Sequence, residues 1–585
     1  MASWALISRY LPCISHNKQK LVLSLRQSSP RPFKYRKYTA SNDKISKGPT
    51  YFITTPIFYV NAVPHVGHLY TAVLSDVISR WQALKGAKVI FSTGTDEHGL
   101  KIQQAAQKAD TYPQKLCDTV SASFRKLFEE ANIVYTDYIR TTEERHKLAV
   151  QHFWKVLEER GQLYKGVYEG YYCTADEAFL TSDQIVKQQN PDGSIKMVSA
   201  ESGHAVEWMK ETNYMFRLSE YKDKLSRWLN TGVIHPTVFE PLVWSWLENL
   251  QDLSVSRENS RLHWGIPVPG DETQTIYVWL DALVNYLTAA GYPRAGLHWP
   301  ADCQVVGKDI LKFHAVYWPA FLMAAGLEPP RQILCHSHWL VDNRKMSKSI
   351  GNVVNPGEQM SLFGVDGVRY FLMREGVPHN DGNYEEMKVL NCVNAELGNT
   401  LGNLVNRCTS PAVNPSLAFP AFQEIHFLEY SSEKDKEMLQ ALFNLPGAVE
   451  AQYENFSIYK AINLVMNQLR ETNRFVNDHR PWELAKASDQ RLQEWHSSML
   501  AVVFETLRMC GILLSPVVPR ISEKLMSRLG ILEEMWTLES IRNLTNEKLS
   551  RRQASKLGKS KELIYQNIKK KALDQKQNQI VKHIS

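Results

Sequence analysis

The segment Thr54–His68 constrains the fold more than any other part of this chain. It begins as a β-prone apolar run, turns through proline and glycine, and leads into a helix opening at His68, after which apolar residues recur at helical spacing. Gly86 predicts the end of that helix, and Val89–Phe91 begins another strand. The pattern predicts a strand-turn-helix-strand unit. The N-terminus of its helix, with unpaired N–H groups and the positive end of the helix dipole, is suited to bind an anion.

Two histidines three residues apart, His65 and His68, lie at the N-terminus of that helix. At this spacing both side chains project to the same side, where each can donate to a phosphate oxygen. Gly67 between them lets a ligand approach the backbone closely. Taken alone, the same spacing fits a pair of surface or capping histidines equally well.

A second polar motif, Lys345-Met346-Ser347-Lys348-Ser349, follows a predicted strand at 332–334. Its two lysines and two serines have no apolar periodicity, which predicts a mobile cationic loop that can close over an anion. Five such residues alone could equally form a solvated surface loop. The two motifs in one chain are far more specific than either alone.

Together these motifs resemble the signatures of the class I aminoacyl-tRNA synthetases: His65-Val66-Gly67-His68 resembles their "HIGH" element and 345–349 matches their "KMSKS" loop. From about Tyr51 to about Leu532 the chain resembles the methionyl-tRNA synthetases, in particular the mitochondrial forms. The resemblance implies ATP-dependent activation of L-methionine to methionyl-adenylate and its transfer to the 3′ end of tRNA(Met). It also implies an α/β fold, with a Rossmann-like catalytic domain, a connective insertion and an all-α anticodon-binding bundle.

The domain organisation expected from pattern and resemblance has seven parts. Between residues 391 and 529 helical periodicity continues without strand signals, which predicts the bundle directly. The expected parts are a mitochondrial transit peptide (1–47), the first catalytic half (48–143), the insertion (144–275), the second catalytic half (276–340), the KMSKS loop and linking region (341–390), the anticodon-binding domain (391–540) and a basic C-terminal tail (541–585).

The resemblance also implies roles for individual residues. Phosphate-facing catalytic groups would be His65, His68, Lys345 and Lys348, and ATP would further contact Gly67, Gly307, Asp309 and Ser347. The methionine pocket would comprise Ile57, Tyr59, Asp96, Arg257, Trp279, Ala282, Tyr286, Ile310 and His314, and the anticodon would meet Asn403, Arg407 and Trp482. Apolar and aromatic walls with one carboxylate suit a methionine side chain and its ammonium group. Singly, a packing role fits Trp279 or Trp482 as well.

The expected cofactors are ATP and Mg²⁺, without zinc. Related enzymes carry Cys-x-x-Cys zinc knuckles in the insertion, but this chain has only Cys173 there, and its eight cysteines include no Cys-x-x-Cys pair. An insertion of about 130 residues also leaves no room for the editing domain of the leucine, isoleucine and valine enzymes.

Charge is concentrated at the two ends of the chain. The net charge is +7, yet residues 1–42 contain eight basic and no acidic residues, so the remainder has 60 basic against 61 acidic. This basic, serine-rich start predicts mitochondrial import to the matrix, and the basic residues of 547–585 predict a solvated extension near tRNA phosphates. No uninterrupted apolar run approaches the length of a membrane span. The protein is also expected to be a monomer.

Two other functions remain open at this point. A catalytically retired paralogue would bind tRNA without chemistry, although it would not need His65, His68 and Lys348 together. A class I synthetase for another amino acid would differ in the pocket between Trp279 and Tyr286.

Overall fold

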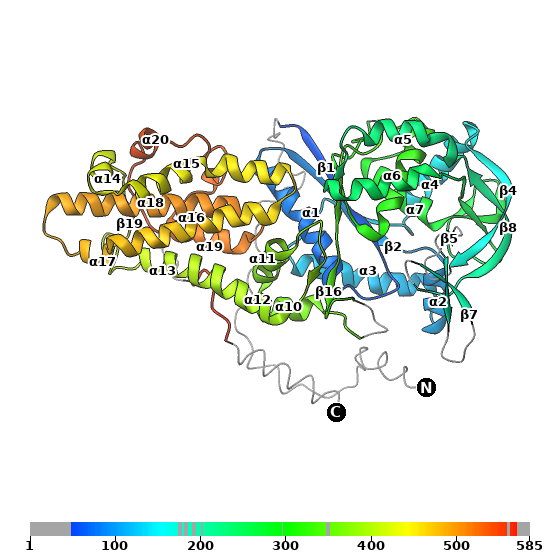
Figure 1. Ribbon diagram of the computed structural model, residues 1–585, viewed down its shortest axis with the longest axis horizontal. Coiled ribbons are helices and arrows are strands. Elements are labelled where there is room, and N and C mark those ends of the chain that lie inside the picture. The colour runs from blue at the N-terminus through cyan, green and yellow to red at the C-terminus, as the bar shows by residue number, and fades with distance from the viewer. Residues whose placement is uncertain are drawn as a thin grey trace, which may run out of the picture. The chain divides into compact units, whose positions relative to one another are not determined.

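A six-stranded parallel sheet draws its strands from residues 50–336 of the protein (Figure 1). The computed structural model describes residues 48–173, 178–180, 185–189, 195–200, 203–294, 296–346, 351–558 and 562–569. The strand order is β3-β2-β1-β14-β15-β9, with β1 Thr50–Tyr59, β2 Lys88–Asp96, β3 Asp137–Arg140, β9 Ile234–His235, β14 Cys303–Gly307 and β15 Ile333–His336. The chain reverses its direction of strand addition between β1 and β14, and open parallel sheets bind ligands at such a point.

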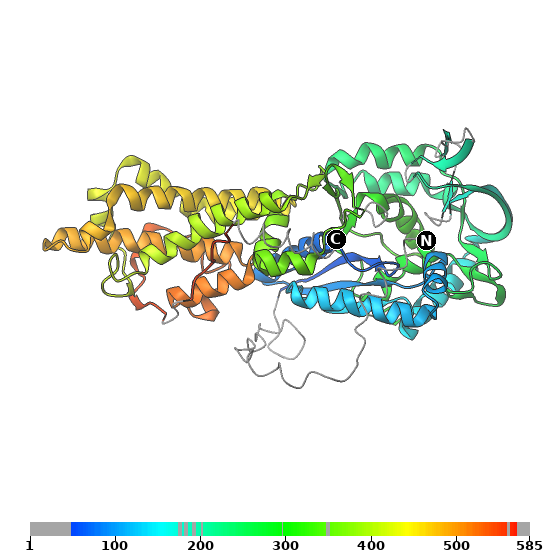
Figure 2. The ribbon, with the colours of Figure 1, turned by 90° about the horizontal axis from the view of Figure 1, so that it is seen from below.

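Helix α1 (Val66–Leu84) follows β1 and packs on β1, β2 and β14. It begins two residues earlier than the periodicity predicts, because the His65 side chain caps it by accepting from the Gly67 N–H. The light-blue helix α3 (Pro113–Glu130) lies along the blue strands in Figure 2. Helices α4 (Glu144–Glu159), α7 (Val278–Leu283), α8 (Asn285–Ala290) and α9 (Trp318–Ala325) contribute to a second apolar core in the same part.

The segment predicted as the insertion forms small antiparallel sheets. One has the order β10-β8-β4-β5 and another β11-β13-β12, and β6 pairs with β7 as a hairpin. Their bounds are β4 Leu163–Cys173, β5 Ala178–Leu180, β6 Ile185–Gln189, β7 Ile195–Ser199, β8 Glu207–Phe216, β10 Leu253–Ser254, β11 Ser256–Glu258, β12 Pro267–Val268 and β13 Asp271–Ile276. Strand β9 comes from the same segment yet pairs with β15, so the central sheet draws on residues expected in the insertion.

Long antiparallel helices form the second part of the protein. In Figure 1, α15 (Glu433–Glu454), α16 (Ile458–His479) and α18 (Gln490–Leu514) lie alongside one another, with α19 (Pro519–Leu529) against α18. The shorter elements are α12 (Glu386–Val393), the π-helix η6 (Asn394–Gly402), α13 (Asn403–Cys408), α14 (Glu424–Tyr430), α17 (Pro481–Leu484) and α20 (Asn546–Ser550). This confirms the expected α/β catalytic domain followed by a helical bundle.

Helix α18 is the one described helix that is long and apolar enough to cross a membrane. It is the core helix of the bundle, since 94% of its most apolar window is buried inside the protein. Two of its charged residues, Glu505 and Arg508, form a buried ion pair with each other.

A linking region, through which the chain passes from the sheet to the bundle, contains β16 (Trp339–Val341), β17 (Arg344–Lys345), β18 (Gly382–Asn383), α10 (Pro356–Phe363) and α11 (Val365–Glu375). The buried Arg369 on α11 donates to Asp76 of α1 at 2.7 Å and to the carbonyls of Pro516 and Val517 after α18. Trp81 of α1 stacks on Tyr453 of α15, with ring centroids 4.0 Å apart. A single apolar core therefore runs from the sheet into the bundle.

The C-terminal segment differs from the solvated extension that its charge suggests. Strand β20 (Ser555–Lys556) pairs with β19 (Ala418–Phe419). Further on, Ile564 is buried, and the Tyr565 hydroxyl donates to the carbonyl of Phe363. A few apolar residues between the lysines thus suffice to fix the described part of this segment against the protein.

Candidate active site

A cavity of about 250 Å³ opens at the carboxyl ends of β1, β2, β14 and β15. Fourteen predicted site residues line it: Ile57, Tyr59, His65, Gly67, His68, Asp96, Trp279, Ala282, Tyr286, Gly307, Asp309, Ile310, His314 and Lys345. They come from segments up to 288 positions apart in the chain. The sheet edge therefore gathers the predicted phosphate-facing and methionine-facing groups into one site.

The two histidines of the first motif are fixed by the backbone of their own helix. His65 Nδ1 accepts from the Gly67 N–H at 3.0 Å, and His68 Nδ1 accepts from the His65 N–H at 3.2 Å. The two rings stack with centroids 3.8 Å apart. Burial, reinforced by His65, lowers the pKa of His68 well below its ordinary value. His68 is therefore a neutral imidazole with its proton on Nε2, which makes Nε2 a hydrogen-bond donor.

Gly67 is required by the histidine pair itself. A Cβ atom at this position would lie 2.8 Å from Cε1 of His65. Any larger residue would displace the His65 ring from its capping position, so the glycine serves the histidine geometry as well as ligand approach.

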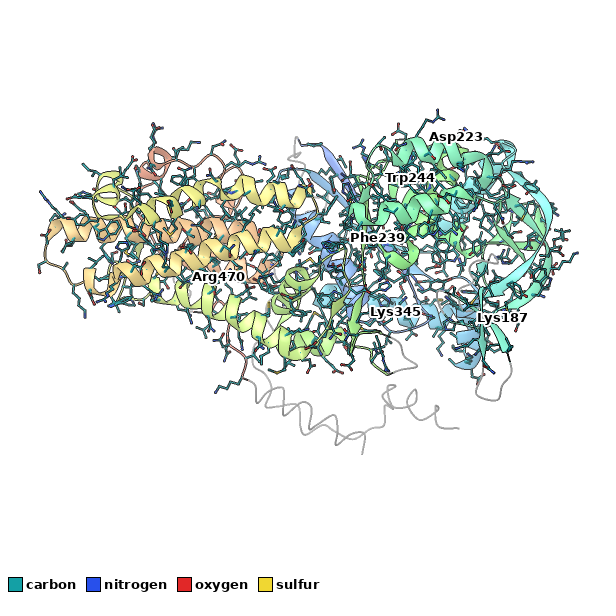
Figure 3. All side chains as sticks on the ribbon, in the orientation of Figure 1. Lys187, Asp223, Phe239, Trp244, Lys345 and Arg470 are labelled. Atoms are coloured by element: carbon teal, nitrogen blue, oxygen red, sulfur yellow. The ribbon has the colours of Figure 1, made fainter. Side chains whose placement is uncertain are left out.

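A charged cluster lies at the rim of the cavity beside the second motif. Lys345 Nζ lies 3.7 Å from Asp309 Oδ2, and His338 Nε2 lies 3.3 Å from Asp309 Oδ1. Burial opposes ionisation of Asp309, but His338 and Lys345 hold its pKa below the ordinary value. Lys345 is marked in Figure 3. Ser347 and Lys348, the other predicted members of this motif, lie outside the described residues.

One wall of the cavity is aromatic. Trp279 of α7 stacks on Phe313, with ring centroids 3.7 Å apart, and Ala282 and Tyr286 follow on the next turns. Asp96, at the end of β2, is buried and lines the same space. An amino acid whose apolar side chain is enclosed by these walls would place its α-ammonium group toward Asp96.

Hydrogen bonds determine which ring nitrogen carries the proton in two buried histidines of the cavity wall. His314 Nδ1 donates to the carbonyl of Ile310 and Nε2 accepts from the Tyr286 hydroxyl at 2.7 Å. His336 Nδ1 donates to the carbonyl of Ser337, and Nε2 accepts from the Thr71 hydroxyl at 2.8 Å. Burial lowers the pKa of each histidine to about 4.

These two histidines predict a loss of stability in mild acid. An unfolded histidine has a pKa near 6.5, so between about pH 6.5 and pH 4 the unfolded chain binds more protons and stability falls as the pH falls. At pH 5 each contributes a loss of about 2 kcal/mol relative to pH 7. Denaturant unfolding of His336→Asn at both pH values should show a pH dependence smaller by about that amount, whereas His263→Asn, at an exposed position, should match wild type. An unchanged dependence in His336→Asn would contradict the prediction.

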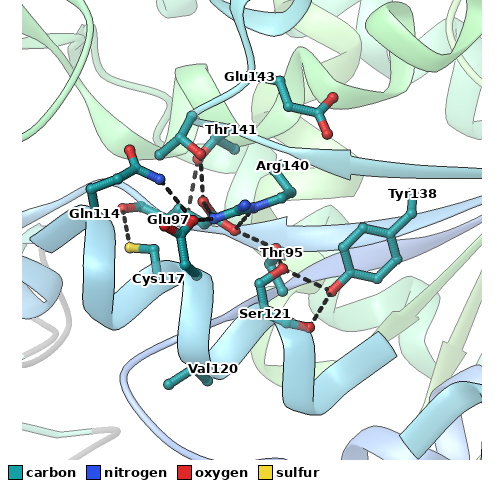
Figure 4. Close-up of polar contacts among 12 residues, drawn as sticks. Thr95, Glu97, Gln114, Cys117, Val120, Ser121, Tyr138, Arg140, Thr141 and Glu143 are labelled. Carbon is teal, nitrogen blue, oxygen red and sulfur yellow. Dashed lines mark hydrogen bonds and ion pairs between the residues drawn. The ribbon is translucent and has the colours of Figure 1, made fainter. Parts of the chain in front are cut away.

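Next to Asp96, the fully buried Glu97 holds the end of β2 in place (Figure 4). Its carboxylate accepts from Arg140 of β3 at 2.7 and 2.9 Å, from Thr95 at 2.7 Å and from Thr142 at 2.5 Å. Its backbone carbonyl accepts from the Trp264 indole at 2.6 Å. The carboxylate is thus occupied by protein donors, which suits a structural role beside Asp96, which lines the cavity.

Arg257 is the described member of the predicted methionine set that does not line the cavity. It is buried between the rings of Tyr172 and Tyr277, and it donates to the carbonyl of Ser256 and the hydroxyl of Ser254. In this structure it supports the wall, and its contact with methionine stays a prediction.

Conversely, several cavity residues carry no motif that marks them in the sequence. They are Tyr70, Thr71, His336, Ser337, His338 and Trp339. Three of them, His336, Ser337 and His338, lie at the carboxyl end of β15, where open parallel sheets bind ligands, and this position could have pointed to them.

The predicted anticodon residues lie at the bundle end of the chain. Arg407 donates to Asn477 at 2.6 Å and to Asn473 at 3.2 Å, both on α16, while Asn403 is exposed on α13 and Trp482 is half-buried on α17. A second, open cavity of about 420 Å³ adjoins this place and is lined by Asn399, Thr400, Arg470 (marked in Figure 3), Asn473, Arg474, Asn477 and Asp478. Amide and guanidinium groups of this kind can read the edges of unpaired bases.

Metal ligands are sparse. In the described ranges, no three His, Cys, Asp or Glu side chains are grouped so as to hold a metal ion, and Cys173 is a buried cysteine that forms no disulfide.

Comparison with known proteins agrees with this geometry. Residues 51–409 match the family described as tRNA synthetases class I (M), and residues 435–584 match the anticodon-binding domain of tRNA ligase. The mitochondrial methionine--tRNA ligase of Homo sapiens is 53% identical over 497 residues, which cover 82% of this chain and 84% of that protein. The chain belongs to the class I methionyl-tRNA synthetases. The ligase of Dictyostelium discoideum, named as a probable mitochondrial form, is 42% identical over 82% of this chain and 86% of its own.

The fold matches solved methionyl-tRNA synthetases as well. The Mycobacterium tuberculosis enzyme in complex with methionyl-adenylate superposes with a TM-score of 0.82 at 34% identity, covering 88% of this chain and 99% of that one. Its free form has a TM-score of 0.76 at 30% identity, covering 89% and 99%. Membership in this family removes the alternative of a class I synthetase of another kind.

Proposed function

We propose that this protein activates L-methionine with ATP and transfers it to mitochondrial tRNA(Met) in the mitochondrial matrix, acting as a monomer. The observation that carries the proposal is that one cavity is lined both by imidazole and ammonium groups and by an aromatic wall with a buried carboxylate. The relatives named as mitochondrial ligases support mitochondrial action.

In the first step a methionine carboxylate oxygen attacks the α-phosphorus of ATP. The new P–O bond gives methionyl-adenylate, and the bond to the β-phosphate oxygen breaks to release pyrophosphate. His65 and His68 would donate to the phosphates from the helix side, and Lys345 and Lys348 from the loop. The protein needs no nucleophile, because positioning and charge stabilisation account for catalysis of such a transfer.

In the second step the terminal ribose hydroxyl of the tRNA attacks the adenylate carbonyl. Methionine becomes esterified to the tRNA, AMP leaves, and the hydroxyl proton is lost. Asp96 would hold the methionine ammonium group through both steps, and Trp279, Ala282 and Tyr286 would enclose the thioether, where sulfur-aromatic contacts add modest affinity.

Mg²⁺ would neutralise charge on the triphosphate. Asp96 and Asp309 are the carboxylates among the described residues that line the cavity, and Asp309 is paired with His338 and Lys345. The donor set therefore fits an ion held mostly by phosphate oxygens and water, with few protein ligands.

The test is amino-acid-dependent exchange of labelled pyrophosphate into ATP, with the full chain and each of the twenty amino acids. Exchange with methionine alone supports the proposal. Folded protein that shows no exchange with any amino acid but binds tRNA would overturn it in favour of a non-catalytic RNA-binding protein.

Trp482→Ala is expected to weaken aminoacylation alone, because stacking of one base on an aromatic ring is worth about 1–3 kcal/mol. The kcat/KM for tRNA(Met) should fall by roughly 10- to 100-fold, while pyrophosphate exchange stays at the wild-type rate. Trp482→Phe keeps an aromatic face and should retain most of the activity. Loss of both activities together would assign Trp482 to packing instead.

A further inference from the structure

A buried carboxylate behind the methionine pocket joins three separate elements. Asp281 of α7 has no solvent exposure. Its Oδ2 atom accepts from His98 Nδ1 at 2.7 Å and its Oδ1 atom accepts from His146 Nε2 at 2.8 Å. His98 follows the end of β2 two residues after Asp96, and His146 lies on α4. One carboxylate therefore connects the helix of the pocket wall to the strand end that carries the substrate-facing Asp96.

Helix α7 depends on tertiary contacts for its orientation. It is six residues long, its N-terminus has no side-chain cap, and Val284 separates it from α8. Trp279, Ala282 and Leu283 line the cavity, whereas Asp281 does not. Since a helix this short is marginal by itself, its tertiary contacts must set where the wall stands.

The carboxylate is held as an anion. Although burial raises the pKa of a carboxyl group, His98 and His146 lower that of Asp281 to about 2. Hydrogen bonds to an ionised acceptor are shorter and stronger than neutral ones. His146 continues the connection, because its Nδ1 atom lies 3.0 Å from the hydroxyl of Thr288 on α8.

A direct chemical role does not fit these three residues. None of them lines the cavity, and they form no metal-binding group among the described residues. We propose that Asp281 is a positioning residue for methionine: by binding His98 and His146 it sets the spacing between the aromatic wall of α7 and the ammonium-binding Asp96. The proposal rests on the proposed function, because it concerns the substrate of that same site.

The test is the kinetics of pyrophosphate exchange for Asp281→Asn, which keeps the volume and one acceptor but removes the charge. We expect its KM for methionine to rise about tenfold, with kcat and the KM for ATP within twofold of wild type. Asp281→Ala, which removes both hydrogen bonds, should raise the KM for methionine further. The double variant His98→Asn/Asp281→Asn should raise it no more than the larger single change, since the two residues share one contact.

Asp435→Asn is the matched control. Asp435 is also a buried carboxylate that accepts from a histidine, His479, at 2.9 Å, but it lies on α15 in the bundle. It should lower the melting temperature as Asp281→Asn does and leave the KM for methionine unchanged. A KM for methionine within twofold of wild type in Asp281→Asn, or an equal rise in both KM values, would overturn the inference. Wild-type protein without methionine-dependent exchange would instead overturn the proposed function itself.

Discussion

Replacing His68 with alanine is expected to slow methionyl-adenylate formation by about 100- to 1,000-fold, the usual effect of removing one preorganised donor to a developing negative charge. His68 is neutral, and its Nδ1 atom is occupied by the His65 N–H, which leaves the Nε2–H group as the donor at the cavity. Methionine affinity should change little, because the residues expected to enclose methionine, such as Trp279 and Tyr286, lie on α7 and α8 rather than on α1. Single-turnover adenylate formation, with methionine binding measured separately, checks both parts.

The control for His68→Ala must separate the lost donor from the lost helix cap. Helix α15 begins with the same kind of capping box, in which Ser432 and Asp435 bond reciprocally to the backbone. Ser432→Ala removes such a cap far from the cavity and should leave adenylate formation unchanged. A normal rate in His68→Ala would exclude His68 from phosphate binding.

Asp96→Asn is expected to raise the KM for methionine by about 100-fold. The substitution keeps the shape of the side chain but removes its charge, and a hydrogen bond to a charged group contributes about 1.5–3 kcal/mol in a buried site. The KM for ATP should stay near that of wild type. Steady-state exchange kinetics with each substrate varied in turn measure the two values.

Asp302→Asn is a suitable control for Asp96→Asn. Asp302 precedes β14 at the amino edge of the same sheet, where it accepts from the Phe52 N–H at 2.7 Å and from Arg331 at 2.6 Å. Its substitution tests the loss of a sheet-end carboxylate without touching the cavity, so both KM values should remain normal. A normal KM for methionine in Asp96→Asn would assign the ammonium group to another partner.

The sequence was most informative where local chemistry and local structure coincide. The turn around Gly67 and the strand ends before Asp96 and Gly307 combine a structural signal with a functional one, and all three positions line the cavity. Parallel strands bring their carboxyl ends to one edge, which explains why motifs so far apart in the chain meet.

The pairing of strands and side chains that lie far apart in the chain could not be predicted from the sequence. Strands β3 and β9 have four and two residues, too short for a periodic signal, and they exist because β2 and β15 offer open edges. The partners of Asp281 lie 183 and 135 positions away, and no local pattern links a carboxylate to two such histidines. Within the described part of the basic C-terminal segment, the expectation of a solvated extension did not allow for Ile564, which is buried, or for Tyr565, whose hydroxyl donates to the carbonyl of Phe363.

The core shared by sheet and bundle determines how this protein can be dissected. The family matches end at 409 and resume at 435, which invites separate production of a catalytic and an anticodon-binding fragment. A cut there would expose the face of Trp81 that stacks on Tyr453 and would leave the buried Arg369 without the carbonyls of Pro516 and Val517. A catalytic fragment ending near residue 410 should therefore be poorly soluble, and its inactivity would reflect a broken core rather than any requirement for tRNA.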